Sequence, residues 1–310
     1  MELVLYWIAR VLIAILQSLP LSWVVRLGRI GGIIAYWLDK RHRRVAVANL
    51  TKCFGNELSP QQIRAIAREN FGRIGENYAA AVRTSAMTRR EIEDVLEVAG
   101  LDPFLKSYAN ASGNWIVAIG HFGNFELYAR AVYWVPGRQF ATTYRALRQP
   151  SLNRLMQSLR ERSGCLFFER RTELNALREA LRKQDLVLGF LSDQHAGDRG
   201  LPVPFFGETC STTAAPAIFA LRYNCPLLVA VCYRTSPGKW RIEVGPEIPT
   251  HADGQPRPLI EITQDINRAF ETAVRRDPAN WFWVHERWKP GKYRKNLQSG
   301  STSDPPSLRP

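Results

Sequence analysis

The chain has 310 residues, of which 45% are hydrophobic. This length and composition exclude a disordered protein and suit one large α/β domain with a sizeable core. The 42 Lys and Arg residues against 28 Asp and Glu residues give a net charge of +14, which favours anionic partners. Nucleic acid is not the expected partner, because the sequence has no zinc-ligand spacing, no Arg-rich tail and no RNA-recognition motif.

The amino-terminal segment is mostly apolar. Its longest charge-free stretch, residues 11–25, has fifteen residues, whereas a transmembrane helix perpendicular to the bilayer needs about 20. We therefore expect residues 1–38 to form a helical membrane anchor that either spans the bilayer with snorkelling arginines or lies in its interface. A soluble core hairpin, broken at Pro20 and at Gly31-Gly32, is the alternative. The basic run at 40–44 predicts that the following domain lies on the cytoplasmic side.

Beyond the basic run, helical and strand patterns alternate. Residues 59–82 carry a proline at the first helical position and apolar residues at helical spacing, and 88–96 follow as a second helix. The other expected elements are a strand at 116–119, a helix starting at Glu126, a strand at 140–144, a helix at 151–162, a strand at 165–168, a helix at 173–183, strands at 186–191, 227–233 and 240–244, and a helix at 258–276. This order predicts an α/β fold with a central, mostly parallel mixed sheet flanked by helices, in one catalytic domain at 39–292. The Ser- and Pro-rich tail at 293–310 is expected to be disordered.

The segment Trp115 to Arg130 holds the strongest candidate for chemistry. A buried strand delivers His121 into a turn that contains Gly123, and Glu126 follows at the fifth position. Residues five apart on a continuous helix lie about 140° apart around its axis, so the two side chains meet only across a bend. In that geometry the Glu126 carboxylate keeps one imidazole nitrogen protonated while the other removes a proton from an attacking hydroxyl. The alternative is a structural histidine, because the bare pattern also occurs by chance.

Several charged residues follow the expected strands and should meet at one edge of the sheet. They are His121, Arg145, Glu169-Arg170-Arg171 and Asp193. Ligands gather at the carboxyl ends of strands in open α/β sheets, and arginines there hold phosphates by bidentate hydrogen bonds. A solvated loop is the alternative for Arg170 and Arg171, and we expect Asp193 to pair with an arginine and fix the site.

Metal and nucleotide chemistry are not expected from the sequence. Asp193, His195 and Asp198 have no third histidine or carboxylate at convincing spacing for a metal site. Neither a G-x-S-x-G elbow nor a P-loop is present, which argues against serine hydrolases and nucleotide-dependent enzymes. We therefore assign no metal and no cofactor, and no chemistry to His285.

The motif GHFGNFE at 120–126 resembles the signature of the bacterial lipid A biosynthesis acyltransferases, the lauroyl/myristoyl acyltransferase family, whose usual form is HFGNWE. Phe125 stands where that family often has Trp. Further matching blocks lie in the family's order, so that the resemblance covers about residues 1–292. They are an Arg...Asn-Leu...Cys-Phe block at 43–54, Thr-Tyr-Arg at 143–145, Leu-Ser-Asp-Gln at 191–194, Pro-Phe-Phe-Gly at 204–207, and the aromatic and basic block WFWVHERWK at 281–289.

The resemblance implies a glycerolphosphate-acyltransferase-like fold and an enzyme on the cytoplasmic face of the cell inner membrane. It implies transfer of a fatty acyl chain from an acyl carrier protein thioester, or from acyl-CoA, to a hydroxyl of a lipid A precursor, which is an anionic glycolipid. It also implies substrate-binding roles for Asn124, Arg160 and Gln194. His195 departs from the family pattern, in which an acidic or small residue is common, so its role stays open.

Three other functions remain open at this point. The first is an acyltransferase whose acceptor is another glycolipid or a lysophospholipid. The second is a thioesterase, in which the His/Glu pair hydrolyses the thioester. The third is a protein that binds lipid without catalysis. The related glycerophosphate acyltransferases normally have Asp in place of the motif Glu and a later Glu-Gly-Thr-Arg block, and this chain has neither.

Overall fold

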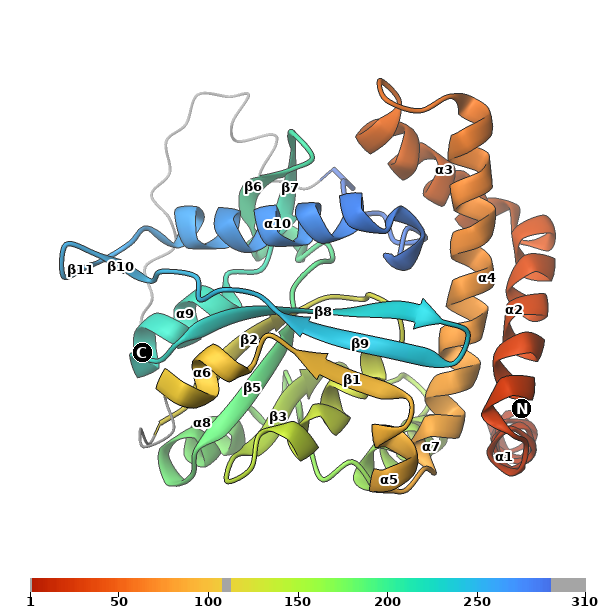
Figure 1. Cartoon of the computed structure of the whole chain (residues 1–310), viewed down its shortest axis with the longest axis horizontal. Coiled ribbons are helices and arrows are strands. Elements are labelled where there is room, and N and C mark those ends of the chain that lie inside the picture. The colour runs from red at the N-terminus through yellow and green to blue at the C-terminus, as the bar shows by residue number, and fades with distance from the viewer. Residues whose placement is uncertain (1, 108–112, 291–310) are drawn as a thin grey trace.

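The computed structural model describes residues 2–107 and 113–290. A seven-stranded sheet forms the centre of the molecule, with helices against both faces (Figure 1). Its strands run in the order β1 (Leu96–Ala99), β9 (Lys239–Val244), β8 (Leu227–Ser236), β2 (Trp115–Ile119), β5 (Leu186–Leu191), β3 (Gln139–Tyr144) and β4 (Leu166–Glu169). The predicted α/β fold with a central sheet is confirmed.

The sheet is mostly parallel, as predicted. β8, β2, β5, β3 and β4 run in one direction, β9 is antiparallel to β8, and β1 is parallel to β9. β2 is buried along its whole length, which is typical of a parallel strand covered on both faces. The bounds of β5 are those predicted, and the other predicted strands differ by one to three residues at their ends, β8 most of all.

Each face of the sheet has its own apolar layer. One layer holds α8 (Leu174–Lys183), α9 (Ala215–Tyr223) and α10 (Leu259–Arg276), the long helix drawn above β8 and β9 in Figure 1. The opposite layer holds α5 (Arg89–Glu93), α6 (Asp102–Ser107) and η1 (Phe125–Trp134). The helix that was predicted to begin at Glu126 is η1, a 3-10 helix that begins one residue earlier, at Phe125.

Several elements were not predicted from the sequence. They are β1, the hairpin of β6 (Leu201–Phe205) and β7 (Glu208–Thr212), the short pair β10 (His251–Ala252) and β11 (Gln255–Pro256), α3 (Lys40–Phe54), α6, α9, η2 (Gly197–Arg199) and η3 (Pro278–Asn280). The β6–β7 hairpin packs against α10. Helix α7 (Pro150–Glu161) lies close to its predicted position and has no buried side chain.

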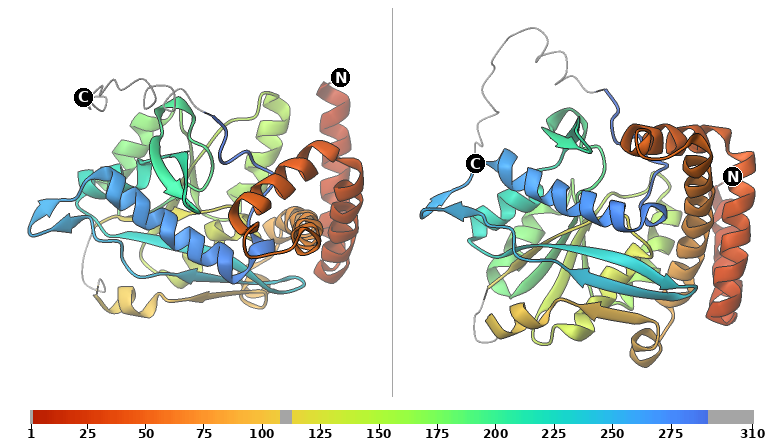
Figure 2. Two further views of the ribbon diagram at one scale, coloured as in Figure 1. Left: turned by 90° about the horizontal axis from the view of Figure 1, so that it is seen from above. Right: turned by 45° about the horizontal axis from the view of Figure 1, so that its top comes forward.

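The amino-terminal helices stand at one side of the sheet (Figures 1 and 2). α1 (Glu2–Ser18) and α2 (Leu21–Leu38) pack along α4 (Pro60–Ser85), whose first turn is closed by a capping box between Ser59 and Gln62. The alternative break at Gly31-Gly32 is wrong, because α2 continues through it. Gly32 instead allows close helix contact, since a Cβ there would lie 2.1 Å from the Phe71 carbonyl oxygen of α4.

Large apolar side chains of α1 and α2 remain on the surface. Within residues 2–107 and 113–290, no helix combines the length and apolarity that crossing a membrane requires. The predicted disordered tail at 293–310 lies outside the described residues.

Candidate active site

His121 stands in a tight turn at the carboxyl end of β2. Gly123 has φ +52°, and a Cβ at this position would lie 2.6 Å from the Cys232 carbonyl oxygen, so only glycine fits without strain. The Gly123 N–H donates to the Asn280 carbonyl oxygen over 3.1 Å, and Phe122 forms an isolated antiparallel bridge with Trp281. The turn is thus fixed by the end of η3 (Pro278–Asn280) and by the residue that follows it.

The partner of the His121 imidazole is Asp193. The Nδ1–H of His121 donates to Asp193 Oδ1 over 2.8 Å, and Asp193 Oδ2 accepts the main-chain N–H of His121 and the indole N–H of Trp281, each over 2.8 Å. Asp193 is 1% exposed. Burial alone raises the pKa of this carboxyl, but the charge and hydrogen bonds of His121 and the Trp281 indole outweigh it, and the pKa lies below its usual value. Asp193 is therefore a carboxylate that leaves Nε2 of His121 as the basic nitrogen.

Glu126 is not hydrogen-bonded to the imidazole, so the predicted hydrogen bond between Glu126 and His121 is wrong. Its carboxylate makes a two-point ion pair with Arg160, with distances of 2.5 Å and 3.0 Å. Glu126 lies in the first turn of η1 and Arg160 in the last turn of α7, so this ion pair joins the two helices. The expectation that Asp193 pairs with an arginine is also wrong, because its oxygens are taken by His121 and Trp281.

The strand register explains why Asp193 meets His121. β2 and β5 are neighbours in the sheet although β3 and β4 lie between them in the chain. Ile119 pairs with Leu191 at the ends of these strands, and the two site residues each follow two positions later. Parallel neighbours carry such residues to the same edge of the sheet.

A cavity of about 780 Å³ opens beside His121. Its mouth is polar and includes His121, the Glu126–Arg160 pair, Arg145 and Gln194. Farther in, it lies between the sheet and η1, where its walls are apolar. These walls include Val117, Ile119, Tyr128, Ala131, Val135, Val187, Leu228 and Ala230. A deep apolar chamber with a few polar groups at one end is typical of a site for a ligand with a long apolar part.

The structure brings most of the predicted site residues together. His121, Glu126, Arg145, Arg160, Arg170 and Gln194 line the cavity, and Asp193 lies directly behind His121. Arg145 and Arg170 are exposed at the rim.

Two predicted substrate-binding residues lie elsewhere. Asn124 is 1% exposed and its amide points to Thr84 of α4 over 3.5 Å, so its place is structural. Arg171 is not part of the cavity wall, and its main-chain N–H donates to the Glu169 carboxylate over 2.7 Å. The Glu169 carboxylate closes a turn by accepting this N–H, the Thr172 main-chain N–H and the Thr172 hydroxyl.

Sequence reasoning missed the contribution of the segment 277–288. Its Trp281 holds Asp193, and its His285 lines the cavity. The Arg287 side chain is fully buried and donates to the Gln194 and Ser211 carbonyl oxygens, which ties the segment to the loop after β5. The dense aromatic and basic composition of this segment was the only signal in the sequence.

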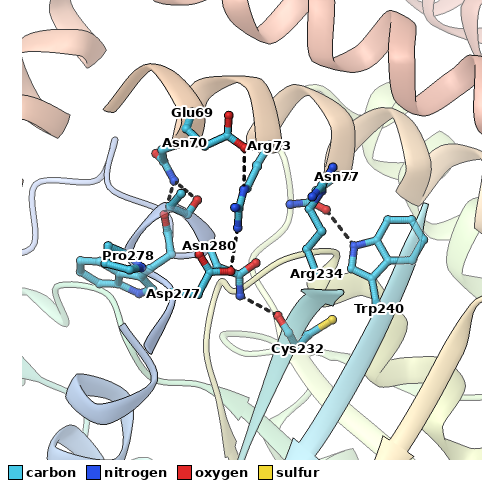
Figure 3. Close-up of polar contacts among 12 residues, drawn as sticks. Glu69, Asn70, Arg73, Asn77, Cys232, Arg234, Trp240, Asp277, Pro278 and Asn280 are labelled. Carbon is cyan, nitrogen blue, oxygen red and sulfur yellow. Dashed lines mark hydrogen bonds and ion pairs between the residues drawn. The ribbon is translucent and has the colours of Figure 1, made fainter. Parts of the chain in front are cut away.

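Helix α4 fixes the same segment from the outside (Figure 3). Asn70 donates to the carbonyl oxygens of Ala279 and Trp281 over 2.9 Å and 2.5 Å, and Arg73 pairs with Asp277 over 2.7 Å. Asn280 in turn donates to the Cys232 carbonyl oxygen of β8 over 2.9 Å. These buried and partly buried bonds hold the backbone that carries Trp281, and hence the His121–Asp193 pair, in one place.

Metal-ligand groups are not assembled at this site. Within the part of the chain that the structure describes, no cluster of three or more His, Cys, Asp or Glu side chains is arranged to hold a metal ion. The groups that the site offers are a base, an ion pair, exposed arginines and an apolar chamber.

The sequence matches known proteins along almost its whole length. The family model of the bacterial lipid A biosynthesis acyltransferases matches residues 1–290. The chain is 28% identical over 293 residues to a lipid A biosynthesis lauroyltransferase of Escherichia coli (strain K12), a match that covers 92% of each chain. It is 25% identical over 278 residues to a lipid A biosynthesis palmitoleoyltransferase of Escherichia coli (strain K12) and to a lipid A biosynthesis acyltransferase of Shigella flexneri, covering 88% of this chain and 87% of each relative. The chain therefore belongs to the bacterial lipid A biosynthesis acyltransferase family and is an acyltransferase.

Proposed function

We propose that the protein transfers a fatty acyl chain from a thioester donor to a hydroxyl of a lipid A precursor, with His121 as general base. The observation that carries this proposal is the His121–Asp193 pair at the mouth of a deep apolar cavity. Nε2 of His121 removes the proton of the acceptor hydroxyl as its oxygen attacks the thioester carbonyl carbon. The C–S bond then breaks, and the leaving thiolate takes the proton back from His121.

Asp193 is a positioning residue in this mechanism. It fixes the imidazole tautomer that leaves Nε2 free, and its charge stabilises the imidazolium that forms during the reaction. We assign this role to Asp193 rather than to Glu126, because the Glu126 carboxylate is ion-paired with Arg160 at the cavity mouth.

The apolar chamber suits the acyl chain of the donor. Its inner walls come from β2, β5, β8 and η1 and carry mostly aliphatic and aromatic side chains. Burial of methylene groups against such walls stabilises a bound chain by about 0.8 kcal/mol for each group. The net charge of +14 favours an acidic acyl carrier protein as the thioester carrier, with acyl-CoA as the alternative donor.

Exposed arginines at the rim suit the anionic acceptor. Arg145 and Arg170 line the cavity mouth, and neither guanidinium makes an ion pair within residues 2–107 and 113–290. Guanidinium groups bind phosphate by two parallel hydrogen bonds, which orients the acceptor as well as attracting it. With Arg160 and Gln194 they form the proposed acceptor subsite.

We also propose that α1 and α2 attach the protein peripherally to the cytoplasmic face of the inner membrane. Both helices expose large apolar side chains, among them Trp7, Trp23 and Trp37. Apolar faces of this kind insert into the bilayer interface, and nearby basic side chains add attraction to anionic lipids. Vesicle flotation should show binding that survives high salt and falls when these three tryptophans are replaced by serine. Release of the intact protein by salt alone would contradict this attachment.

Mass spectrometry of lipids from a deletion strain tests the acceptor. We expect lipid A that lacks one acyl chain, restored by a wild-type copy of the gene but not by His121→Ala. Loss of an acyl chain from a phospholipid while lipid A stays intact would contradict the proposal and favour a lysophospholipid acceptor.

A further inference from the structure

A second histidine, His285, faces the same cavity as His121. It lies half-buried in the segment after η3 and forms part of the cavity wall. Its backbone is fixed, because Asn49 of α3 donates to the His285 carbonyl oxygen over 2.8 Å. Its ring is fixed as well, because the main-chain N–H of His195 donates to His285 Nε2 over 3.0 Å.

This hydrogen bond sets the tautomer of His285. A neutral imidazole that accepts at Nε2 carries its proton on Nδ1. Within the described part of the chain, Nδ1 makes no hydrogen bond and is not fully enclosed by protein atoms. The ring, which forms part of the cavity wall, therefore has an available N–H donor.

The His285 imidazole is neutral near pH 7. Burial lowers its pKa to about 4; the negative charge of Asp193 opposes this shift, whereas His121 adds to it. A neutral imidazole is a fixed dipole that polarises a carbonyl group without exchanging protons with solvent.

We propose that His285 is a further catalytic residue, whose Nδ1–H donates a hydrogen bond to the carbonyl oxygen of the thioester. This inference rests on the proposed acyl transfer. As the acceptor oxygen bonds to the carbonyl carbon, the carbonyl π electrons move to its oxygen, and the Nδ1–H stabilises the resulting oxyanion. When the intermediate collapses, the C=O bond re-forms and the C–S bond breaks, so His285 gains and loses no proton.

Two strong donors beside the base are already engaged, whereas Arg145 and Arg170 are exposed at the rim. Nδ1–H of His121 is bonded to Asp193, and the Arg160 guanidinium is paired with Glu126. His285 and His121 line the same cavity, and the segments that carry them are joined by the antiparallel bridge between Phe122 and Trp281. A pre-oriented donor of this kind contributes about 10²- to 10³-fold in kcat.

Two amide substitutions separate the catalytic role from a structural one. In His285→Asn the side-chain amide occupies the position of Nδ1 and keeps a donor there, but it cannot reach the His195 N–H. In His285→Gln the amide oxygen reaches the position of Nε2 and keeps that acceptor, but Nδ1–H is lost. His251→Gln, at an exposed histidine of β10, is the matched control.

Steady-state transfer with the full-length protein provides the first readout. We expect kcat of His285→Gln to fall by about 10²- to 10³-fold with little change in KM, His285→Asn to keep at least about tenfold more activity, and His251→Gln to equal wild type. Glutamine activity within threefold of wild type, or higher than that of the asparagine variant, overturns the proposal. If His121→Ala also transfers normally, the proposed function itself fails.

NMR of ¹⁵N-histidine-labelled protein gives a second readout that needs no substrate. The His285 ring should be neutral between pH 6 and 8, with its proton on Nδ1. A proton on Nε2, or a charged ring in that range, overturns the proposal even if transfer has not been detected.

Discussion

Replacement of Asp193 by asparagine should inactivate the enzyme by reversing the His121 tautomer. Asp193 Oδ2 accepts two N–H groups, from the His121 main chain and the Trp281 indole, whereas Oδ1 accepts only Nδ1–H. Asparagine has a single oxygen, which is better placed toward the two donors. Its NH₂ group then faces Nδ1 of His121 and donates to it, so the imidazole proton moves to Nε2 and the base is lost.

The expected loss follows from the same change in a Ser-His-Asp triad, where it lowers kcat by about 10⁴-fold. This corresponds to roughly 5 kcal/mol of transition-state stabilisation. Thiol release from the donor in the presence of acceptor measures the rate, and ¹⁵N NMR of the histidines reports the tautomer. Glu126→Gln is the matched control, because it removes a carboxylate from the mouth without touching the imidazole.

Two results would refute this reasoning. The first is a folded Asp193→Asn variant whose kcat lies within tenfold of wild type. The second is a His121 proton that remains on Nδ1 in Asp193→Asn but leaves it in Glu126→Gln, which would return the orienting role to Glu126.

Four further changes test other parts of the site. In a double-mutant cycle, Glu126→Gln and Arg160→Gln should show a coupling of about 1 kcal/mol or more in kcat/KM, because the two side chains are ion-paired; additive effects would contradict a joint role. Ala131→Leu, in the cavity wall, should shift donor preference toward shorter chains in a competition assay, and an unchanged preference would place the acyl chain elsewhere. Gly123→Ala should lower the free energy of unfolding by at least about 1 kcal/mol in urea titrations, because a Cβ there meets a backbone oxygen at 2.6 Å and φ is positive; equal stability would contradict the strain argument. His285 has a folded pKa of about 4, against about 6.5 in the unfolded chain, so the unfolded chain binds its proton first as the pH falls. The free energy of unfolding should therefore be highest above pH 6.5 and fall by roughly 1–2 kcal/mol toward pH 4, after discounting for solvent screening. His285→Gln should flatten this part of a stability–pH curve, and an unchanged slope would contradict the assigned pKa.

The sequence predicted most strands of the sheet but not which side chains meet at their ends. The apolar run of β5 has the bounds that its pattern predicted, because a strand buried on both faces leaves a continuous hydrophobic signal. Residues at the carboxyl ends of the strands were also predicted to meet at one edge of the sheet, because parallel strands end on the same side. That Asp193 reaches His121 depends on β2 and β5 being neighbours in a specific register, which no local pattern records.

The errors in the site have the same physical origin. The spacing of His121 and Glu126 allowed a contact across a bend, but the choice between a histidine and an arginine as partner for Glu126 depends on where α7 packs. Likewise, His285 lies 90 residues beyond its partner His195, and tertiary hydrogen bonds from α3 and α4 fix the segment that carries it. Such long-range contacts leave no periodic signal in a single sequence.

The most direct test of the central claim is the mass of the acceptor after incubation with purified protein and an acyl carrier protein thioester. Wild type should add one acyl chain to a lipid A precursor, and His121→Ala should add none under the same conditions. Free fatty acid released equally with and without the precursor, with no gain in its mass, would show a hydrolase and contradict the account.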